Sequence, residues 1–309
     1  MTSSPAYLLI SHGSRDLRSQ SAIDRLARLV RERLRQNLRG YQPHPPVEPP
    51  VAPSDIAQYS DSRHLWSVQA SSTSRLLASP QRPVPSMAKS MIEMSSTPIV
   101  GTACLELGPC PLHEQIYQFG QRVKAAGVDR VRVLPLFLLE GVHVMEDIPI
   151  EMALARQILN VSLEVTLCPH LGSHLGLRKL LVDRMAEIPS AACLLIAHGS
   201  RRPGGNKPIE EMARQLGAIA AYWSVPPDLE TQIIYLMQKG HQQLVILPYF
   251  LFPGGITDAI TQFTEELAER FPRVNFRLMP PLGATPELAN LVVDLVGEKG
   301  SWQPGVERA

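Results

Sequence analysis

The sequence has few cysteines and no excess of charge of either sign. Its four cysteines, Cys104, Cys110, Cys168 and Cys193, are scattered and form no CxxC pair. This scatter excludes a small disulfide-rich framework and favours the reducing cytoplasm. The 30 Lys and Arg residues against 29 Asp and Glu residues give a net charge of +1, so no bulk field attracts nucleic acid or an anionic membrane. An anionic ligand must therefore be held by local groups.

Long hydrophobic runs and nucleotide-binding motifs are also missing. The first residues, MTSSPAYLLISHGSRD, contain an apolar run too short for a signal peptide or a membrane span, and no later run approaches spanning length. No GxxxxGK[ST] loop is present, which argues against ATP or another nucleotide as a cofactor. The segment GTACLELG lacks the GxSxG pattern of a nucleophilic serine. We therefore predict a cytoplasmic protein with no membrane and no nucleic-acid partner.

What the sequence does contain is an internal repeat. Segments of the first half recur in the second in the same order: AYLLISHGSRD as CLLIAHGSRRP, PLHEQI as DLETQI, and VRVLPLFLLEGVH as LVILPYFLFPGGI. The repeat predicts two copies of one domain fused in tandem, over residues 1–175 and 176–309.

Each copy alternates short apolar runs with amphipathic segments. In the first copy the apolar runs, typical of strands covered on both faces, are residues 7–10, 99–105, 131–138 and 163–167. Helical spacing of apolar residues follows the first strand at Ile23, Leu26, Val30 and Leu34, and follows Pro208 at Ile209, Met212, Leu216 and Ile219. This order predicts an α/β fold with one open parallel sheet per copy, flanked by helices.

Residues 41–96 interrupt the first copy between its first helix and second strand. The segment is rich in Pro and Ser and has no sustained period. We interpret it as a largely disordered surface insertion with no role of its own, and a partner-docking or regulatory segment is the alternative. His44 and His64 fall inside it and are excluded as metal ligands.

Three polar side chains stand where the first three predicted strands end. His12 follows the first strand, Glu106 ends the second, and His143 lies in the loop after the third. Ligands of open parallel sheets bind at the carboxyl ends of the strands, so we expect these side chains at one edge. Two imidazoles and a carboxylate suit a divalent ion such as Co²⁺, Fe²⁺, Ni²⁺ or Zn²⁺, and they also suit proton transfer. Because Glu106 lies among apolar residues, where an unpaired carboxylate is costly, we favour function over a simple salt bridge for it.

Neighbouring residues have alternative interpretations. Gly13, Ser14 and Arg15 complete the turn after His12, where free backbone N–H groups and Arg15 could bind a carboxylate of the ligand. Arg15 could equally form a salt bridge with Asp16 or a helix end. After His143, the acidic pair Glu146 and Asp147 either assists metal entry or caps the helix that follows.

The two copies differ at these positions. The second copy keeps an HGSR turn at residues 198–201, but Ile256 stands in place of His143, and Trp223 falls opposite Glu106 when PLHEQI is aligned with DLETQI. We therefore predict that the first copy is the active half and the second a structural or substrate-covering half. The remaining histidines are predicted to be surface or packing residues: His113, His170, His174 and His241.

The quoted segments resemble a known family. The ISHGSR opening, CLELGPCPLHEQI and LPLFLLEGVHVMEDIP are similar to the class II sirohydrochlorin chelatases, in the long two-domain form. The resemblance implies a lyase that inserts a divalent metal, Co²⁺ or Fe²⁺, into the polycarboxylate tetrapyrrole sirohydrochlorin without ATP, in cobalamin or siroheme biosynthesis. It also implies that His12 and His143 bind the metal and abstract protons, with Glu106 as an acidic residue near the metal.

Alternative functions and several properties stay open. A metal-delivery protein would use His12 and His143 only to hold an ion. A phosphoryl-transfer enzyme would use His12, although Ser11 stands where histidine phosphatases have Arg. The sequence leaves open which metal is inserted, with nickel a further possibility, and it leaves the oligomeric state and any protein partners unknown.

Overall fold

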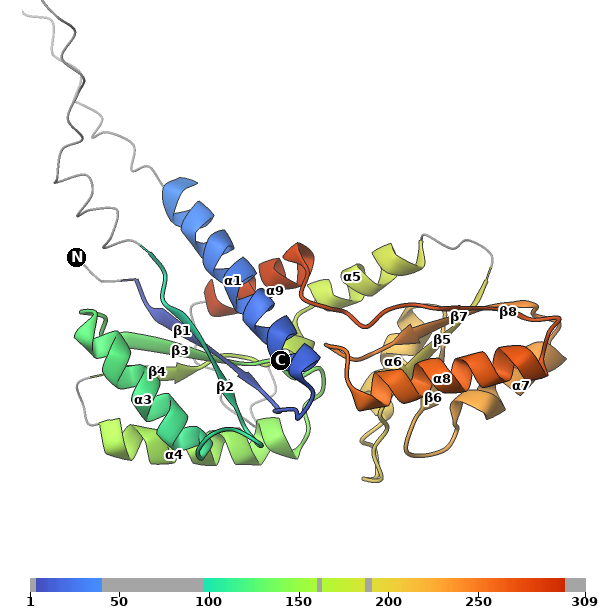
Figure 1. The fold of residues 1–309 in the computed structure, drawn as a ribbon, viewed down its shortest axis with the longest axis horizontal. Coiled ribbons are helices and arrows are strands. Elements are labelled where there is room, and N and C mark those ends of the chain that lie inside the picture. The colour runs from blue at the N-terminus through green and yellow to red at the C-terminus, as the bar shows by residue number, and fades with distance from the viewer. Residues whose placement is uncertain (1–3, 41–96, 160–162, 187–190, 298–309) are drawn as a thin grey trace, which may run out of the picture.

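The structure, a computed structural model, describes residues 4–40, 97–159, 163–186 and 191–297. These residues form two parallel four-stranded sheets, each covered by helices (Figure 1). The strand orders are β2-β1-β3-β4 and β6-β5-β7-β8, so the two sheets have the same topology. The predicted α/β fold with one sheet per copy is confirmed. The insertion at 41–96, with His44 and His64, lies outside the described residues.

The first sheet is made of short, largely buried strands. Its strands are β1 (Ala6–Ser11), β2 (Val100–Cys104), β3 (Arg130–Pro135) and β4 (Glu164–Leu167). Its chain also forms α1 (Leu17–Gly40), α3 (Leu112–Ala125), α4 (Ile148–Leu159) and α5 (Gly176–Met185). The residues predicted to form the inner face of α1, Ile23, Leu26, Val30 and Leu34, are all buried. Strand β3 ends three residues before the predicted Leu138, because the chain turns away from the sheet and the carbonyl of Phe137 instead accepts from the N–H of Gly172.

The second sheet repeats this pattern. It consists of β5 (Ala192–Ala197), β6 (Ile219–Tyr222), β7 (Gln243–Pro248) and β8 (Asn275–Leu278). Its chain also forms α6 (Lys207–Gln215), α7 (Leu229–Gln238), α8 (Gly255–Arg270) and α9 (Pro286–Gly297). The prediction of Ile219 as a helical residue was wrong: α6 ends at Gln215, Gly217 adopts a positive φ of 65°, and Ile219 begins β6.

The last helices of the two copies are exchanged. Helix α9 packs against α1 of the first copy, and Nη1 of Arg132 on β3 donates to the carbonyl of Val296 over 2.6 Å. Helix α5 lies over the second sheet (Figure 1), where the Arg184 guanidinium donates to the carbonyls of Pro280 and Pro281 at 3.1 and 2.9 Å. One hydrophobic cluster accordingly contains residues of both copies. The division into domains at 175/176 stays a prediction.

The carboxyl edges of the two sheets meet. Oγ of Ser19, at the start of α1, donates to the carbonyl of Pro253 after β7 over 2.8 Å. Arg18 reaches Asp258 of α8 through Nη1 and Nη2 at 3.1 and 2.5 Å. The hydroxyl of Tyr249, directly after β7, lies 3.5 Å from the carbonyl of Leu138, after β3. Segments that follow the strands of one sheet therefore contact segments that follow the strands of the other.

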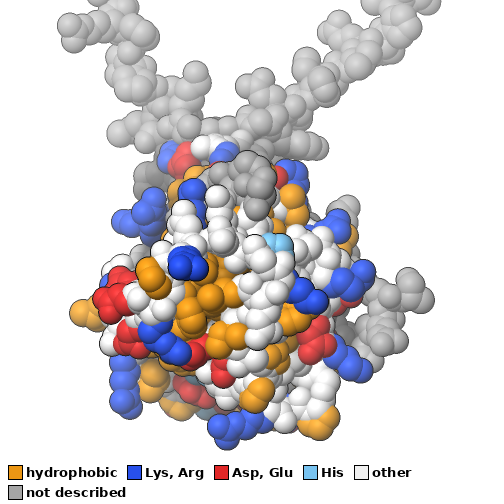
Figure 2. Space-filling model, turned by 90° about the vertical axis from the view of Figure 1, so that its right-hand side faces the viewer, with side chains coloured by type: hydrophobic (Ala, Val, Ile, Leu, Met, Phe, Trp, Pro, Cys, Tyr) orange, Lys and Arg blue, Asp and Glu red, His pale blue; other side chains and the backbone are white. Residues whose placement is uncertain are grey.

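The surface at the outer end of the second copy is not dominated by charge of one sign. Figure 2 shows this end, with basic and acidic side chains interspersed around a group of apolar ones. Among the described residues, no helix is both long enough and apolar enough to cross a membrane.

Candidate metal centre

The ends of β1 and β2 place His12 beside Glu106. The strands pair in parallel as far as Ser11 and Cys104. The ladder then continues beyond both strands, because the N–H of Glu106 donates to the carbonyl of His12 over 2.8 Å. Nε2 of His12 lies 3.9 Å from Oε2 of Glu106. Sheet hydrogen bonding thus holds the backbones of His12 and Glu106 side by side, from which both side chains reach the same edge.

Gly13 allows this close approach. Its φ is 103°, and a Cβ at this position would stand 1.9 Å from the carbonyl oxygen of Glu106. A side chain would therefore push the two turns apart. Leu107, the residue after Glu106, also has a positive φ, 56°, which is uncommon outside glycine.

Glu106 is not buried, contrary to the prediction from its apolar neighbours. Its side chain is 52% exposed. The chain has left the sheet at Leu105, and the turn at Leu107 leaves the carboxylate facing solvent. Its position next to His12, and not the cost of burial, is the argument for a role in a site.

His143 begins a π-helical turn, His143–Asp147, that leads into α4. Its Nδ1 lies 2.7 Å from Oδ2 of Asp147, so the carboxylate fixes the orientation of the ring. Nε2 is then the ring nitrogen left for a metal. In this contact Asp147 orients a candidate ligand instead of capping the helix, and the predicted role of the acidic pair in metal entry stays a prediction. The spacing of four residues in HVMED is the signal that sequence reasoning missed.

The three predicted residues come together in one cluster. One ligand atom each from His12, Glu106 and His143 lies within 4.8 Å of the others. The two imidazole rings meet edge to face, with centroids 4.8 Å apart at 81°, and the Phe137 ring packs 6.3 and 6.0 Å from them. The side chains of His12 and His143 are 51% and 35% exposed, so a large ligand can reach the cluster.

Donor atoms around a bound transition ion lie about 3–4 Å apart, since each metal–ligand bond is about 2.1 Å. The cluster is slightly wider than this, and it offers three donors on one side of a site that is open to solvent. Such a set can hold a divalent ion loosely, with positions left for other ligands. The arrangement suits an ion that must be released.

The turn after His12 has a defined structure. Oγ of Ser14 accepts from the N–H of Asp16 over 3.0 Å, and Asp16 pairs with Arg18 at 2.6 Å. Hydrogen bonds from Arg18 hold the pKa of the Asp16 carboxyl below its usual value. The alternative in which Arg15 pairs with Asp16 was therefore wrong. Arg15 is exposed and has no ion-pair partner within the described ranges.

The second copy keeps one of the three ligand positions. The N–H of Ser224 donates to the carbonyl of His198 over 2.9 Å, the same bond that joins Glu106 to His12. Ser224, and not the predicted Trp223, therefore occupies the place of Glu106. The alignment shifted because residues 223–228 between β6 and α7 are one fewer than residues 105–111 between β2 and α3. Ile256, at the start of α8, takes the place of His143.

The other described histidines do not join the cluster. Glu151 of α4 accepts from the backbone N–H of His113 over 2.6 Å and contacts its Nδ1 at 2.8 Å, which caps the start of α3. His174 lies 3.7 Å from Asp294 of α9, and His241 is exposed. His170 is 6% exposed, its Nδ1 has no hydrogen-bond partner among the described residues, and burial lowers its pKa to about 4.

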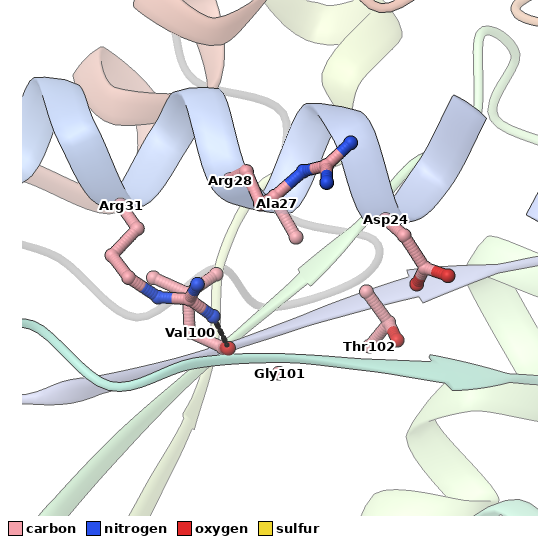
Figure 3. Close-up of a pocket in the computed structure, with 7 residues that line it drawn as sticks. All are labelled: Asp24, Ala27, Arg28, Arg31, Val100, Gly101 and Thr102. Carbon is pink, nitrogen blue, oxygen red and sulfur yellow. Dashed lines mark hydrogen bonds between the residues drawn. The ribbon is translucent and has the colours of Figure 1, made fainter. Parts of the chain in front are cut away.

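A separate hollow of about 210 Å³ lies between α1 and the edge strand β2, away from the cluster (Figure 3). Nη2 of Arg31 donates there to the carbonyl of Val100 over 2.8 Å, while Arg28 points away from the strand. Asp24 and Thr102 stand at the other end. The hollow is shallow and contains none of the predicted site residues. The cluster of His12, Glu106 and His143 is therefore the candidate functional site.

The chain is similar to known chelatases in sequence and in fold. It is 26% identical to the sirohydrochlorin ferrochelatase of Priestia megaterium over 191 residues, covering 57% of this chain and 71% of the relative. It is 23% identical to the sirohydrochlorin cobaltochelatase of the same organism over 198 residues, covering 56% and 62%. The solved structure of SirB from Bacillus subtilis with Fe³⁺ shares the fold, with a TM-score of 0.63 at 18% identity, over 96% of this chain and 94% of that one.

The structure of CbiX, described as the terminal enzyme of siroheme biosynthesis in denitrifying bacteria, matches with a TM-score of 0.52 at 17% identity over 94% of this chain and 97% of that one. The CbiX family model matches twice in succession, at residues 78–188 and at residues 192–299. Together with the repeated sheet, this double match shows that the chain belongs to the CbiX family and contains two copies of its domain.

Proposed function

We propose that the protein is a chelatase, a lyase that inserts Co²⁺ or Fe²⁺ into sirohydrochlorin without ATP. The observation that carries the proposal is the cluster of His12, Glu106 and His143 at the edge of the first sheet. Relatives named sirohydrochlorin ferrochelatase and cobaltochelatase support the substrate. In this proposal residues 1–175 are the active half and residues 176–309 the half with the degenerate site.

The metal ion is a substrate, and the three side chains hold it before transfer. Imidazole and carboxylate together bind ions of the Co²⁺ and Fe²⁺ type. An open set of three donors leaves coordination positions for the pyrrole nitrogens, so the ion can pass from protein to macrocycle without a free intermediate. The Asp147 carboxylate keeps the His143 ring in the orientation that this transfer needs.

Insertion also releases two protons from the pyrrole nitrogens. A base with a pKa near neutral accepts a proton at physiological pH, and imidazole is the side chain with that property. His12 and His143 stand edge to face, with their ring centroids 4.8 Å apart, so one can bind the ion while the other faces the macrocycle. Both functions, metal binding and proton abstraction, are assigned to this pair.

Gly13, Ser14 and Arg15 contact the macrocycle in this proposal. Sirohydrochlorin is a polycarboxylate, and a guanidinium without a partner binds a carboxylate in a bidentate manner. Arg15 is exposed in the turn that follows His12. It can therefore hold a peripheral carboxylate while the ring centre lies over the imidazoles.

An absorbance assay tests the proposal. Purified protein is mixed anaerobically with sirohydrochlorin and Co²⁺, Fe²⁺ or Ni²⁺, in separate reactions and without ATP. Conversion of the tetrapyrrole spectrum faster than in protein-free controls is expected, and the relative rates rank the metals. Tight metal binding with no acceleration for any metal would instead favour a metal-delivery protein.

A further inference from the structure

The turn after β5 keeps the shape of the turn after β1 but has a basic residue where the first turn has its acidic one. In both turns a serine hydroxyl accepts from the N–H two residues later: Ser14 from Asp16 over 3.0 Å and Ser200 from Arg202 over 3.2 Å. Arg202 thus occupies the position of Asp16. Gly204, two residues further on, occupies the position of Arg18, which neutralises Asp16 in the first copy.

The second turn is held in place by its own hydrogen bonds. Oδ1 of Asn206 accepts from the N–H of Ser200 over 2.7 Å, and Nδ2 of Asn206 donates to the carbonyl of Ser200 over 3.1 Å. Gly199 and Gly204 have positive φ values of 87° and 77°. The side-chain carbons of Lys207 lie within 4 Å of a Cβ built on Gly204, so the lysine stem folds back over the turn. The cationic side chains of this segment therefore start from a defined backbone.

These cations are not neutralised. Arg201, Arg202 and Lys207 are exposed, and no carboxylate within the described ranges pairs with them. Acidic residues of the second copy have other partners: Glu211 pairs with Arg214, Asp228 accepts from the N–H of Thr231 at the start of α7, and Asp258 pairs with Arg18. We define the segment from His198 to Lys207 as the basic turn.

The basic turn is at the edge that meets the metal centre. It follows β5 at the carboxyl edge of the second sheet, and this edge contacts the corresponding edge of the first sheet through Pro253, Asp258 and Tyr249. The same edge has lost two metal-ligand positions, to Ser224 and Ile256. The carboxyl edge of the second sheet therefore has positive charge and, among the described residues, no metal site. It faces the carboxyl edge of the first sheet, which has the candidate metal site and its carboxylates.

We propose that the basic turn binds the peripheral carboxylates of a polycarboxylate tetrapyrrole and holds its ring against the metal centre of the first copy. Arg201 and Arg15 are equivalent residues of the repeat, so the two edges present matching guanidinium groups to opposite sides of one macrocycle. Together with Arg15, the basic turn supplies local positive charge on a chain whose net charge is only +1. This inference rests on the proposed function for the identity of the ligand.

Charge reversal of the basic turn tests the inference. The double variant R201E/R202E is compared with the wild type and with R273E, which changes an exposed arginine just before β8, at the opposite edge of the second sheet. Metal-free sirohydrochlorin is titrated into each full-length protein, and binding is followed by tetrapyrrole absorbance. We expect a Kd about tenfold or more higher for R201E/R202E, a smaller difference at high salt, and a Kd for R273E close to that of the wild type.

The titration separates this inference from the proposed function. Metal insertion assays on the same proteins should show a raised KM for sirohydrochlorin in R201E/R202E, with the KM for the metal unchanged. If the wild type inserts metal and R201E/R202E binds sirohydrochlorin as tightly as the wild type, the inference is wrong and the proposed function stands. If the wild type does not bind metal-free sirohydrochlorin, the inference fails whatever the insertion assay shows. Porphyrins with fewer carboxylates should bind the wild type more weakly than sirohydrochlorin does. The R201E/R202E substitutions should reduce the affinity for these porphyrins less than they reduce the affinity for sirohydrochlorin.

Discussion

Nδ1 of His143 lies 2.7 Å from Oδ2 of Asp147, four residues further along the same helical segment. Replacing Asp147 by Ala removes the group that orients the ring, while all three candidate ligands stay in place. We expect the apparent affinity for the metal substrate to fall about 10- to 100-fold, the usual effect of losing such a carboxylate. Insertion rates at varied metal concentration measure this change. Glu146→Ala, at the exposed neighbouring acid, is the control and should behave like the wild type.

The asymmetry of the two copies gives a second prediction. His143→Ala removes a ligand and a base and should abolish most insertion activity. His198→Ala should leave much of it, because Ser224 and Ile256 stand where a metal site would need a carboxylate and a second imidazole. The measurement is the initial insertion rate at saturating sirohydrochlorin and metal. Equal losses in the two variants would contradict the assignment of the first copy as the active half.

Gly13 gives a third prediction. Gly13→Ala places a methyl group 1.9 Å from the carbonyl oxygen of Glu106, so the two turns must separate. We expect a loss of more than about 2 kcal/mol in the free energy of unfolding, with a lower insertion rate in the folded protein. Gly127→Ala is the matched control: its φ is also positive, 78°, but no atom lies within 4 Å of the added carbon. Gly127→Ala should lower the free energy of unfolding by about 1 kcal/mol and leave the insertion rate unchanged. Urea unfolding and the insertion assay distinguish the two variants.

A fourth prediction concerns the buried His170 and the dependence of the free energy of unfolding on pH. Burial lowers its pKa to about 4 in the folded protein, from 6.5 in the unfolded chain. The folded state therefore favours neutral imidazole, and the unfolded state binds the proton more readily. Stability from this group is fully present above pH 6.5 and is lost as the pH falls towards 4, by at most about 3 kcal/mol.

Urea midpoints of the wild type and His170→Gln between pH 7 and 4 measure this effect. The difference in the free energy of unfolding between the two proteins should shrink as the pH falls. His241→Gln, at an exposed histidine, should follow the wild type at every pH. A constant difference between the wild type and His170→Gln would contradict the assignment.

The fold was largely predictable because its signals are local and repeated. Buried parallel strands appear as short apolar runs, and the repeat showed that both halves have the same order of elements. Element ends were less predictable. Ile219 continued the helical spacing of α6, but the turn at Gly217 had already ended the helix.

The candidate site was predictable in its residues and not in its surroundings. The topology rule placed His12, Glu106 and His143 at one edge without any knowledge of distances. The exposure of Glu106, the pairing of Asp16 with Arg18 and the hydrogen bond from His143 to Asp147 depend on side-chain geometry. Sequence spacing does not specify these contacts. The equivalence of Ser224 and Glu106 was missed because it depends on backbone hydrogen bonds at the strand ends.

The exchange of α5 and α9 has a consequence for how the two copies depend on one another. The final helix of each copy packs against the other copy: α9 packs on α1, and α5 contacts α9 and the segment that follows β8. A single copy with this architecture would need a second chain to cover the same apolar surfaces, and its folding would depend on protein concentration. Fusion of the copies makes that association intramolecular. Each chain therefore contains one metal centre and one basic turn, and their pairing does not depend on protein concentration.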